Sequence, residues 1–203
     1  LVWLVDKNNK NLKNYKDKYN VSTNYKEIVD YVDAVSIVTP TVNHYEIARY
    51  FIERNKHVLI EKPMTQTVSE AEKLINLAKK HKKTIQIGHL ERFNPVIRKV
   101  SSLIKNPLFI EVHRLAQFNP RSTDVNVVYD LMIHDIDITT SLVRSKIKKI
   151  SSFGKNIITN KIDIANARLE FCNGTIANLT ASRISQKNER KIRIFEKDKY
   201  LSL

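Results

Sequence analysis

An aspartate and a histidine one helical turn apart are the residues of this sequence best suited to acid-base chemistry. They are Asp130 and His134, in the mainly apolar stretch VVYDLMIHDIDITTSLV, residues 127–143. On a regular helix Asp130, His134, Asp137 and Ser141 share one face within about 60°, and a buried polar stripe must pair with neighbours or line a wet cleft. The carboxylate can orient the imidazole and raise its basicity, which suits a general base near neutral pH. A purely structural Asp-His pair is the alternative.

Other polar residues stand where expected strands end. The stretches LVWLVD, DAVSIVTP, HVLIEKP and TIQIGH each predict a short buried strand that stops at a polar side chain or a proline. Ligands of open parallel sheets bind outside the carboxyl ends of the strands, and a carboxylate such as Asp6 can accept both hydroxyl protons of an adenosine ribose while repelling a 2′-phosphate. Singly, each residue has an ordinary explanation as a cap, a turn or a solvated ion pair. The candidates at these ends are Asp6, Thr39, Pro40, His44, Glu61, Lys62, Pro63 and His89.

The elements that must position these residues alternate along the first half. Strands are expected at 1–6, 33–39, 57–63 and 84–90, where the sequence is nearly continuously apolar, as buried parallel strands are. Helical patterns occupy 11–20, 43–56 and 69–83. Alternating strands and helices predict a parallel sheet with helices on its faces.

The second half has a different pattern. Helices are expected at 94–106 and 127–143, and Asn173-Gly174 is a strong signal for a tight hairpin turn. We therefore predict an α/β chain: a truncated Rossmann-type parallel sheet in residues 1–90, then an α+β domain with a mainly antiparallel sheet in residues 91–203. The strands expected in the second half are 108–118, 148–159, 163–171, 175–184 and 190–203.

Composition excludes several classes of protein. The formal net charge is +14 over 203 residues, but the lysines are scattered, so nucleic-acid binding is not expected. No apolar run reaches the roughly 20 residues that cross a bilayer, and the opening stretch does not fit a signal peptide, so we expect a cytoplasmic protein without membrane contact. No metal site is expected. The single Cys172 cannot form an internal disulfide and is expected to be a small buried side chain.

The motifs together resemble a known family. The run VSIVTPTVNHYEIA, then NKHVLIEKPMTQTVSEAEKLI, then YDLMIHDID resembles the Gfo/Idh/MocA family of oxidoreductases over essentially the whole chain. The E-K-P and D-x-x-x-H elements, in this order and spacing, are specific when they occur together. IGHLERFNP, PLFIEVHRL and NLTASRIS look like the branch that oxidises the 3-hydroxyl of UDP-N-acetylglucosamine with NAD in lipid A precursor synthesis. NADP is the less expected cofactor.

The resemblance implies roles for individual residues. Lys62 would lie between the nicotinamide ribose and the substrate hydroxyl, next to a cis Lys62-Pro63 bond. His134 would remove the hydroxyl proton, and Asp130 would orient His134. The residues implied at the cofactor are Asp6, at the ribose, with Thr39, Pro40, His44, Glu61 and Lys62.

Arginines near expected strand ends and loops are the candidates for the substrate's diphosphate, which a guanidinium grips with two parallel hydrogen bonds. Each of them has a surface location as its alternative. The candidates are Arg92, Arg114, Arg121 and Arg183, with Asn94 beside the first in LERFNP. The resemblance also implies a homo-oligomer formed through the open face of the second-domain sheet.

Two further readings of the function stay open: a related dehydrogenase of a free polyol or sugar such as inositol, and a noncatalytic sensor of NAD and sugar nucleotides. The chain has only three glycines and no G-x-G-x-x-G phosphate loop. We therefore expect that a first strand, loop and helix of about 30 residues belong before Leu1, and that a returning segment belongs after Leu203. On this view the chain is a piece of the enzyme and inactive alone.

Overall fold

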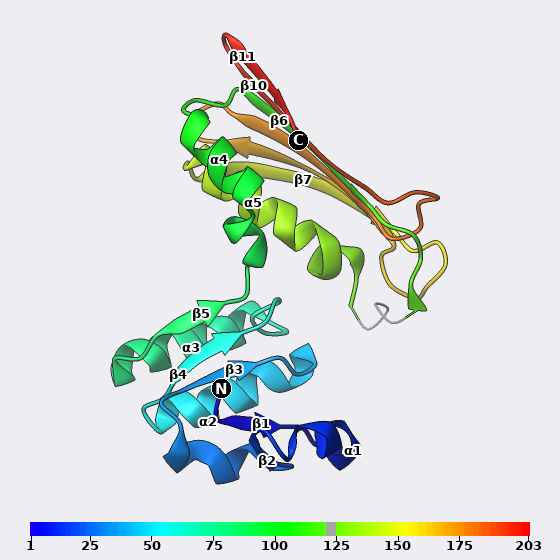
Figure 1. Ribbon diagram of the computed structural model, residues 1–203. Helices are drawn as coiled ribbons and strands as arrows, with labels where there is room; N and C mark the ends of the chain where they lie inside the picture. The colour runs from blue at the N-terminus through cyan, green and yellow to red at the C-terminus, as the bar shows by residue number, and fades with distance from the viewer. Residues whose placement is uncertain (121–124) are drawn as a thin grey trace. The chain divides into compact units, whose positions relative to one another are not determined.

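The computed structural model describes residues 1–120 and 125–203, and the chain divides into two compact units, Leu1–Gly88 and His89–Leu203 (Figure 1). The division lies slightly before the boundary drawn from the sequence. Of the predicted site residues, Arg121 falls outside the described part of the chain.

The first unit is built on parallel strands. They form two sheets, β1-β2 and β3-β4-β5, rather than the single sheet expected. The strands are β1 (Trp3–Val5), β2 (Asn20–Ser22), β3 (Ala34–Ile37), β4 (His57–Ile60) and β5 (Ile85–Ile87). The helices are α1 (Asn9–Leu12), α2 (His44–Glu53) and α3 (Val68–His81), with 3-10 turns η1 (Lys13–Tyr15), η2 (Tyr25–Tyr31) and η3 (Thr41–Asn43).

Helix α2 packs on β3 and β4, and α3 packs on α2. Phe51 and Ile52 of α2 and Leu74 of α3 are almost fully buried in one apolar core with Ile60 of β4. Such burial of apolar side chains is the main stabilisation of a fold of this kind. Thr67 caps α3 in a reciprocal pair with Glu70, which fixes the start of the helix.

The prediction of a helix at 11–20 is wrong. Helix α1 ends at Leu12, a 3-10 turn follows, and the unpredicted strand β2 begins at Asn20. Leu12 is the one residue of α1 and η1 that is buried, so no apolar stripe holds a longer helix against the core.

The second unit is an α+β layer structure, as predicted. Its sheet has the order β11-β10-β6-β9-β8-β7; β6 and β9 run parallel, and the other neighbours run antiparallel. Helices α4 and α5 cover one face of this sheet (Figure 1). The elements are α4 (Pro95–Leu103), β6 (Phe109–Leu115), α5 (Ile133–Val143), β7 (Ile147–Lys155), β8 (Ile164–Phe171), β9 (Ile176–Ser182), β10 (Glu189–Glu196) and β11 (Lys199–Ser202), with 3-10 turn η4 (Leu90–Phe93) and π turn η6 (Val128–Met132).

The expected hairpin joins β8 to β9. Gly174 has a φ of +88°, a conformation that side-chain-bearing residues rarely adopt. The expectation that Cys172 is buried is wrong, because β8 ends at Phe171 and the thiol lies exposed in the turn.

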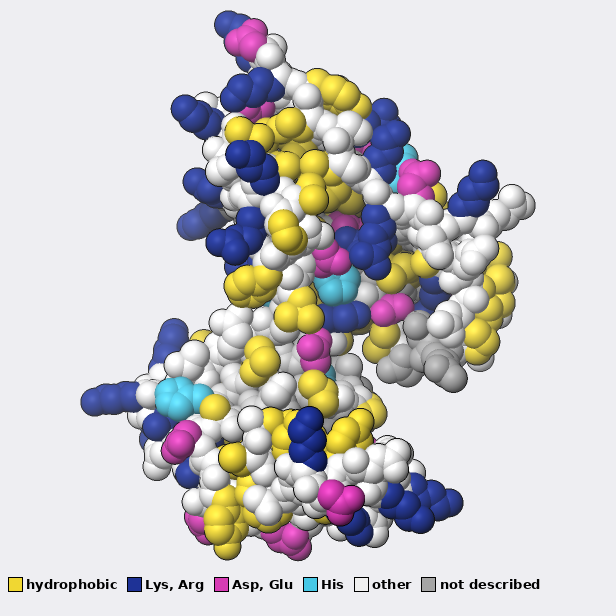
Figure 2. Space-filling model, viewed as in Figure 1, with side chains coloured by type: hydrophobic (Ala, Val, Ile, Leu, Met, Phe, Trp, Pro, Cys, Tyr) yellow, Lys and Arg dark blue, Asp and Glu magenta, His cyan; other side chains and the backbone are white. Residues whose placement is uncertain are grey.

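Lysine and arginine side chains are spread over the face seen in Figure 2 among apolar and neutral ones, without one continuous basic patch. Within the described residues, no helix has the length and apolar character needed to cross a membrane. The same residues contain no group of three His, Cys, Asp or Glu side chains placed to hold a metal ion.

Candidate functional site

The ends of β3, β4 and β5 lie along one edge, as the sequence predicts for a parallel sheet, whereas β1 belongs to the other sheet. Ile37, Ile60 and Ile87 are register partners across β3, β4 and β5. Just beyond them, the Glu61 backbone N–H donates to the Ile37 carbonyl at 3.0 Å, and the Gly88 N–H donates to the Ile60 carbonyl at 2.8 Å. The edge therefore continues by one residue on two of the strands, and Lys62 follows directly, half-buried.

Glu61 is packed into this edge. A Cβ atom added to Gly88 would lie 3.0 Å from the carboxyl atoms of Glu61, so a larger residue there would push that carboxylate aside by a few tenths of an ångström. The Lys62 backbone N–H donates to Glu61 Oε2 at 3.2 Å. Glu61 is thus half-buried at the edge and accepts a backbone hydrogen bond, and its role at the cofactor stays a prediction.

His44 ties two loops of this edge together. Its Nδ1 lies 2.9 Å from the Pro63 carbonyl oxygen, and its Nε2 lies 2.8 Å from that of Thr39, with only 1% of the residue exposed. The ring donates its N–H to one of these carbonyl oxygens and contacts the other. His44 therefore holds the loops from beneath, while Thr39 and Pro40 are exposed. The Lys62-Pro63 peptide is cis, as predicted.

Asp6 follows β1 and is both a turn former and an available carboxylate. Its Oδ1 accepts from the Asn8 N–H at 2.7 Å and its Oδ2 from Asn11 Nδ2 at 2.8 Å. These hydrogen bonds, the one from Asn11 first, hold the pKa of Asp6 below its usual value. Each oxygen keeps a further lone pair, so the carboxylate at this strand end can accept hydrogen bonds from the ribose hydroxyls of a dinucleotide.

In the second unit, the helix that carries Asp130 and His134 is not regular. Residues Val128–Met132 form a π turn, and α5 begins at Ile133. The angles expected for a continuous α-helix therefore do not apply to Asp130. Such turns occur frequently at functional sites. His134 is half-buried at the start of α5, and its pairing with Asp130 stays a prediction.

A cavity of about 420 Å³ adjoins Asp130. Its wall combines carboxamides, one aromatic ring and one arginine, so it is polar with little net charge. The lining residues are Ala116, Gln117, Phe118, Asn119, Pro120, Asp130, Leu131, Arg183 and Asn188.

The predicted substrate arginines are engaged by aspartates. Arg92 donates from Nε to Asp137 Oδ2 at 2.7 Å and from a terminal nitrogen to Oδ1, which raises the pKa of Arg92 above its usual value. Arg114 donates to both oxygens of Asp135 at 2.7 to 2.9 Å, and both side chains are buried, 7% and 2% exposed. The surface alternative is therefore wrong for Arg114. Burial raises the pKa of Asp135, and the hydrogen bonds from Arg114 oppose that rise.

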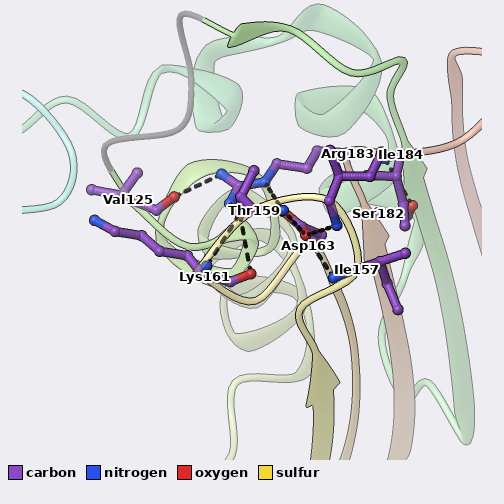
Figure 3. A network of polar contacts seen from close by, with 9 residues as sticks. Val125, Ile157, Thr159, Lys161, Asp163, Ser182, Arg183 and Ile184 are labelled. Atoms are coloured by element: carbon purple, nitrogen blue, oxygen red, sulfur yellow. Dashed lines mark hydrogen bonds and ion pairs between the residues drawn. The ribbon is translucent and has the colours of Figure 1, made fainter.

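Arg183 is also buried, in the network shown in Figure 3. Its Nε donates to Asp163 Oδ1 at 2.9 Å, and its terminal nitrogens donate to the Val125 carbonyl and the Thr159 hydroxyl. Asp163 is fully buried and also accepts backbone N–H groups from the loop after β7. These loop hydrogen bonds hold the pKa of Asp163 well below its usual range, although burial alone would raise it.

Asn94 has a local structural role. Its side chain accepts from the Val96 N–H at 3.0 Å and caps α4. Ser141, the last residue of the polar helix face predicted from the sequence, donates its hydroxyl to the Ile138 carbonyl within α5. His89 Nδ1 lies 4.0 Å from Asp137 Oδ2.

Two buried aspartates that hold the arginines, Asp135 and Asp163, were not predicted from the sequence. One signal for Asp135 was available: in FIEVHRL, Arg114 has the inward phase of Ile110 and Val112, and a buried arginine needs a buried acceptor. The sequence did not identify which acceptor.

Two family models match the chain. Residues 1–89 match an oxidoreductase family with an NAD-binding Rossmann fold, named GFO_IDH_MocA, and residues 98–200 match the GFO/IDH/MocA C-terminal domain.

Two curated relatives are similar over most of this chain. The UDP-N-acetylglucosamine 3-dehydrogenase of Acidithiobacillus ferrooxidans is 42% identical over 173 residues, which cover 85% of this chain and 55% of the relative. The scyllo-inositol 2-dehydrogenase (NAD(+)) of Bacillus subtilis is 28% identical over 170 residues, covering 76% and 49%. The chain thus spans about half the length of these curated relatives.

Solved structures show the same fold. UDP-N-acetylglucosamine 3-dehydrogenase GnnA from A. ferrooxidans superposes with a TM-score of 0.95 at 36% identity, covering all of this chain and 68% of that one. Myo-inositol 2-dehydrogenase from Lactobacillus plantarum gives a TM-score of 0.89 at 20% identity, covering all of this chain and 68% of that one. The predicted fold class is confirmed.

Proposed function

The chain belongs to the Gfo/Idh/MocA family of oxidoreductases, and from this membership we propose that the protein is an NAD-dependent dehydrogenase that oxidises a sugar hydroxyl to a ketone. The proposed substrate is UDP-N-acetylglucosamine, oxidised at its 3-hydroxyl for lipid A precursor synthesis in the cytoplasm. The relative that is 42% identical carries that activity in its name. The observation that carries the proposal is the presence in one chain of a sheet edge ending in Glu61, Lys62 and Pro63 and a helix bearing Asp130 and His134.

A bound NAD would supply the hydride acceptor for the carbon that carries the hydroxyl. Asp6 would accept hydrogen bonds from the ribose hydroxyls, and Thr39 and Pro40 would line the cofactor's path. Glu61, packed against Gly88, would lie under the bound cofactor at the edge of the sheet. His44 would contribute by holding the Thr39 and Pro63 carbonyls in place.

Two side chains would act on the substrate hydroxyl. His134 takes its proton, and the ammonium of Lys62 stabilises the alkoxide as the carbon-oxygen double bond forms. Asp130 orients the imidazole so that its accepting nitrogen faces the hydroxyl. The electron pair of the broken C–H bond leaves as hydride, so charge and atoms balance.

The substrate's remaining groups would meet a mixed set of residues. Asn94 remains a proposed contact of a sugar nucleotide, whereas the half-exposed Arg92 is bound to Asp137. Arg114 and Arg183 would shape the site through their aspartates. The oligomer would form through the face of the second-unit sheet that α4 and α5 leave open, a role supported only by the resemblance to the family.

A dehydrogenase of a free polyol is the second candidate, because an inositol dehydrogenase is 28% identical over 76% of the chain. The two candidates differ in which substrate produces NADH.

The test uses the full-length protein with UDP-N-acetylglucosamine, myo-inositol and scyllo-inositol. We expect NADH with the sugar nucleotide, and we expect His134→Ala to lower kcat about 100- to 10,000-fold while the Kd for NAD stays nearly unchanged. NADH from an inositol alone would favour the second candidate. An equal loss of kcat and NAD affinity would contradict the role of His134.

A further inference from the structure

Two arginine-aspartate pairs involve residues just after His134 that flank it around the circumference of the helix. Asp135 is bound by Arg114 from strand β6, and Asp137 is bound by Arg92 from the turn η4. All of these elements belong to the second unit. The helix that carries the proposed base is thus fastened to a central strand and to a separate segment.

The positions of the aspartates on the helix matter. At about 100° per residue, Asp135 lies about 100° to one side of His134 and Asp137 about 60° to the other. A carboxylate held on each flank resists rotation of α5 about its own axis in either direction. Viewed down the helix axis, His134 lies between Asp135 and Asp137, the two residues held by ion pairs.

The π turn gives a reason for such fastening. A π turn holds one residue more than the α-helical turn it replaces, so converting Val128–Met132 to regular helix would rotate the following residues by about 100° relative to the preceding ones. Apolar contacts of α5 with the sheet resist this only weakly, since hydrophobic contacts have no preferred direction. Bidentate ion pairs, in contrast, do have a preferred direction.

Stability alone is a weak explanation for these pairs. Burying an ion pair carries a desolvation penalty, and apolar residues of similar size are often as stabilising or more so. The Arg114 and Asp135 side chains are 7% and 2% exposed, so that penalty applies to them in full. The attested use of buried ionic groups is to specify one arrangement among several.

We propose that Arg92, Arg114, Asp135 and Asp137 are positioning residues that lock the rotation of α5 and thereby aim His134 at the substrate hydroxyl. This rests on the proposed function. The positioning role takes the place of the diphosphate-binding role that the sequence suggested for Arg92 and Arg114.

The Arg92 pair offers the cleaner test, because Arg92 is 53% exposed and its loss leaves the core intact. Positioning predicts that Arg92→Gln and Asp137→Asn each lower kcat at least tenfold with little change in KM, because misplacement by about 1 Å can reduce rate 100-fold. The double variant should be no worse than either single variant, since both remove one contact. Arg49→Gln, which removes the exposed pair with Glu53, is the matched control and should leave kcat unchanged.

Other results would overturn the proposal. A higher KM with unchanged kcat for Arg92→Gln, not reproduced by Asp137→Asn, would make Arg92 a substrate contact. Multiplying losses in the double variant would show that the two residues act separately.

A measurement that does not depend on activity separates the positioning role of these residues from the proposed dehydrogenase function. In a Cys172→Ser background, the thiol introduced by His134→Cys is labelled with a small maleimide, with and without Arg92→Gln. We expect Arg92→Gln to change the labelling rate several-fold and Arg49→Gln to leave it unchanged. Equal rates in all three proteins would refute the positioning role even if the enzyme is active. A selective change in a protein that makes no NADH from any tested substrate would support the lock while the proposed function fails.

Discussion

Asp163→Asn keeps the shape of a fully buried side chain and removes its charge. In the described part of the chain, Oδ2 of Asp163 accepts the N–H groups of Ile157, Ile158 and Thr159, and Oδ1 accepts from the Thr159 hydroxyl and Arg183 Nε (Figure 3). An asparagine can place its oxygen on one side only. Its NH₂ group must then face at least two donors.

The size of the loss follows from those contacts. Hydrogen bonds to charged groups contribute about 1.5–3 kcal/mol each, so losing two removes about 3–6 kcal/mol. The variant also leaves the guanidinium of Arg183 buried, and breaking a buried ion pair costs about 3–5 kcal/mol by itself. The two estimates describe the same contacts and are not summed. We expect the free energy of unfolding of the second unit to fall by about 3–5 kcal/mol at neutral pH.

The pH dependence has a definite sign. The pKa of Asp163 is lowered in the folded state, so its contribution is complete above the unfolded pKa of about 3.9 and is lost as pH falls towards the folded value. The difference between wild type and Asp163→Asn should stay constant from pH 7 to about 5 and shrink below about 4. Asp135, whose raised pKa has the opposite effect, is present in both proteins and cancels.

Urea unfolding measures the difference. Circular dichroism follows both units, whereas the single tryptophan, Trp3, lies in β1 and reports on the first. With a slope of about 2 kcal/mol per molar urea, the second-unit midpoint should fall by about 2 M. Asp198→Asn, an exposed change after β10, is the control and should shift stability by less than about 0.5 kcal/mol. An unchanged midpoint for Asp163→Asn, or a difference from wild type that widens towards pH 3, would refute the reasoning.

Two more predictions concern the first unit. Gly88→Ala should destabilise it by about 1 kcal/mol, the low end for overpacking because the Glu61 carboxylate ends a flexible side chain, and should weaken NAD binding. Trp3 fluorescence in urea and calorimetric titration measure the two effects, and full retention of both would show that the Glu61 carboxylate moves aside freely. Asp6→Ala should weaken NAD binding and narrow the preference over NADP, measured by titration of both cofactors, and an unchanged ratio of the two Kd values would remove Asp6 from the ribose.

Much of the fold was predictable because apolar patterns are long where elements are deeply buried. The strands expected at 33–39, 57–63 and 84–90 contain β3, β4 and β5. Strand β2 was missed because its sequence, NVS, contains one apolar residue and follows a lysine-rich stretch, unlike the more apolar β1 and β5 regions. The π turn before α5 was not predictable either, since its apolar residues also fit a regular helix.

The site was predictable only where neighbours in sequence decide it. Residues that follow adjacent parallel strands must meet at one edge, so Glu61 was placed beside the end of β3 without coordinates. Arg114 and Asp135, by contrast, are brought together by a strand and a helix whose relative placement depends on packing of the whole second unit. A sequence shows that a buried arginine needs an acceptor, but not which one.

The same chemistry explains why the arginines were assigned to the substrate. A guanidinium binds a carboxylate and a phosphate with the same pair of parallel hydrogen bonds, so a sequence cannot separate an internal partner from a ligand. Arg183 is the basic residue among those lining the cavity beside Asp130, and Asp163 already neutralises it. The carboxamides of Gln117 and Asn188 and the ring of Phe118 then dominate that wall. Apart from the Asp130 carboxylate, such a surface offers hydrogen bonds and stacking without an unneutralised positive charge, so it does not provide the cationic grip on a diphosphate that the sequence suggested for Arg183.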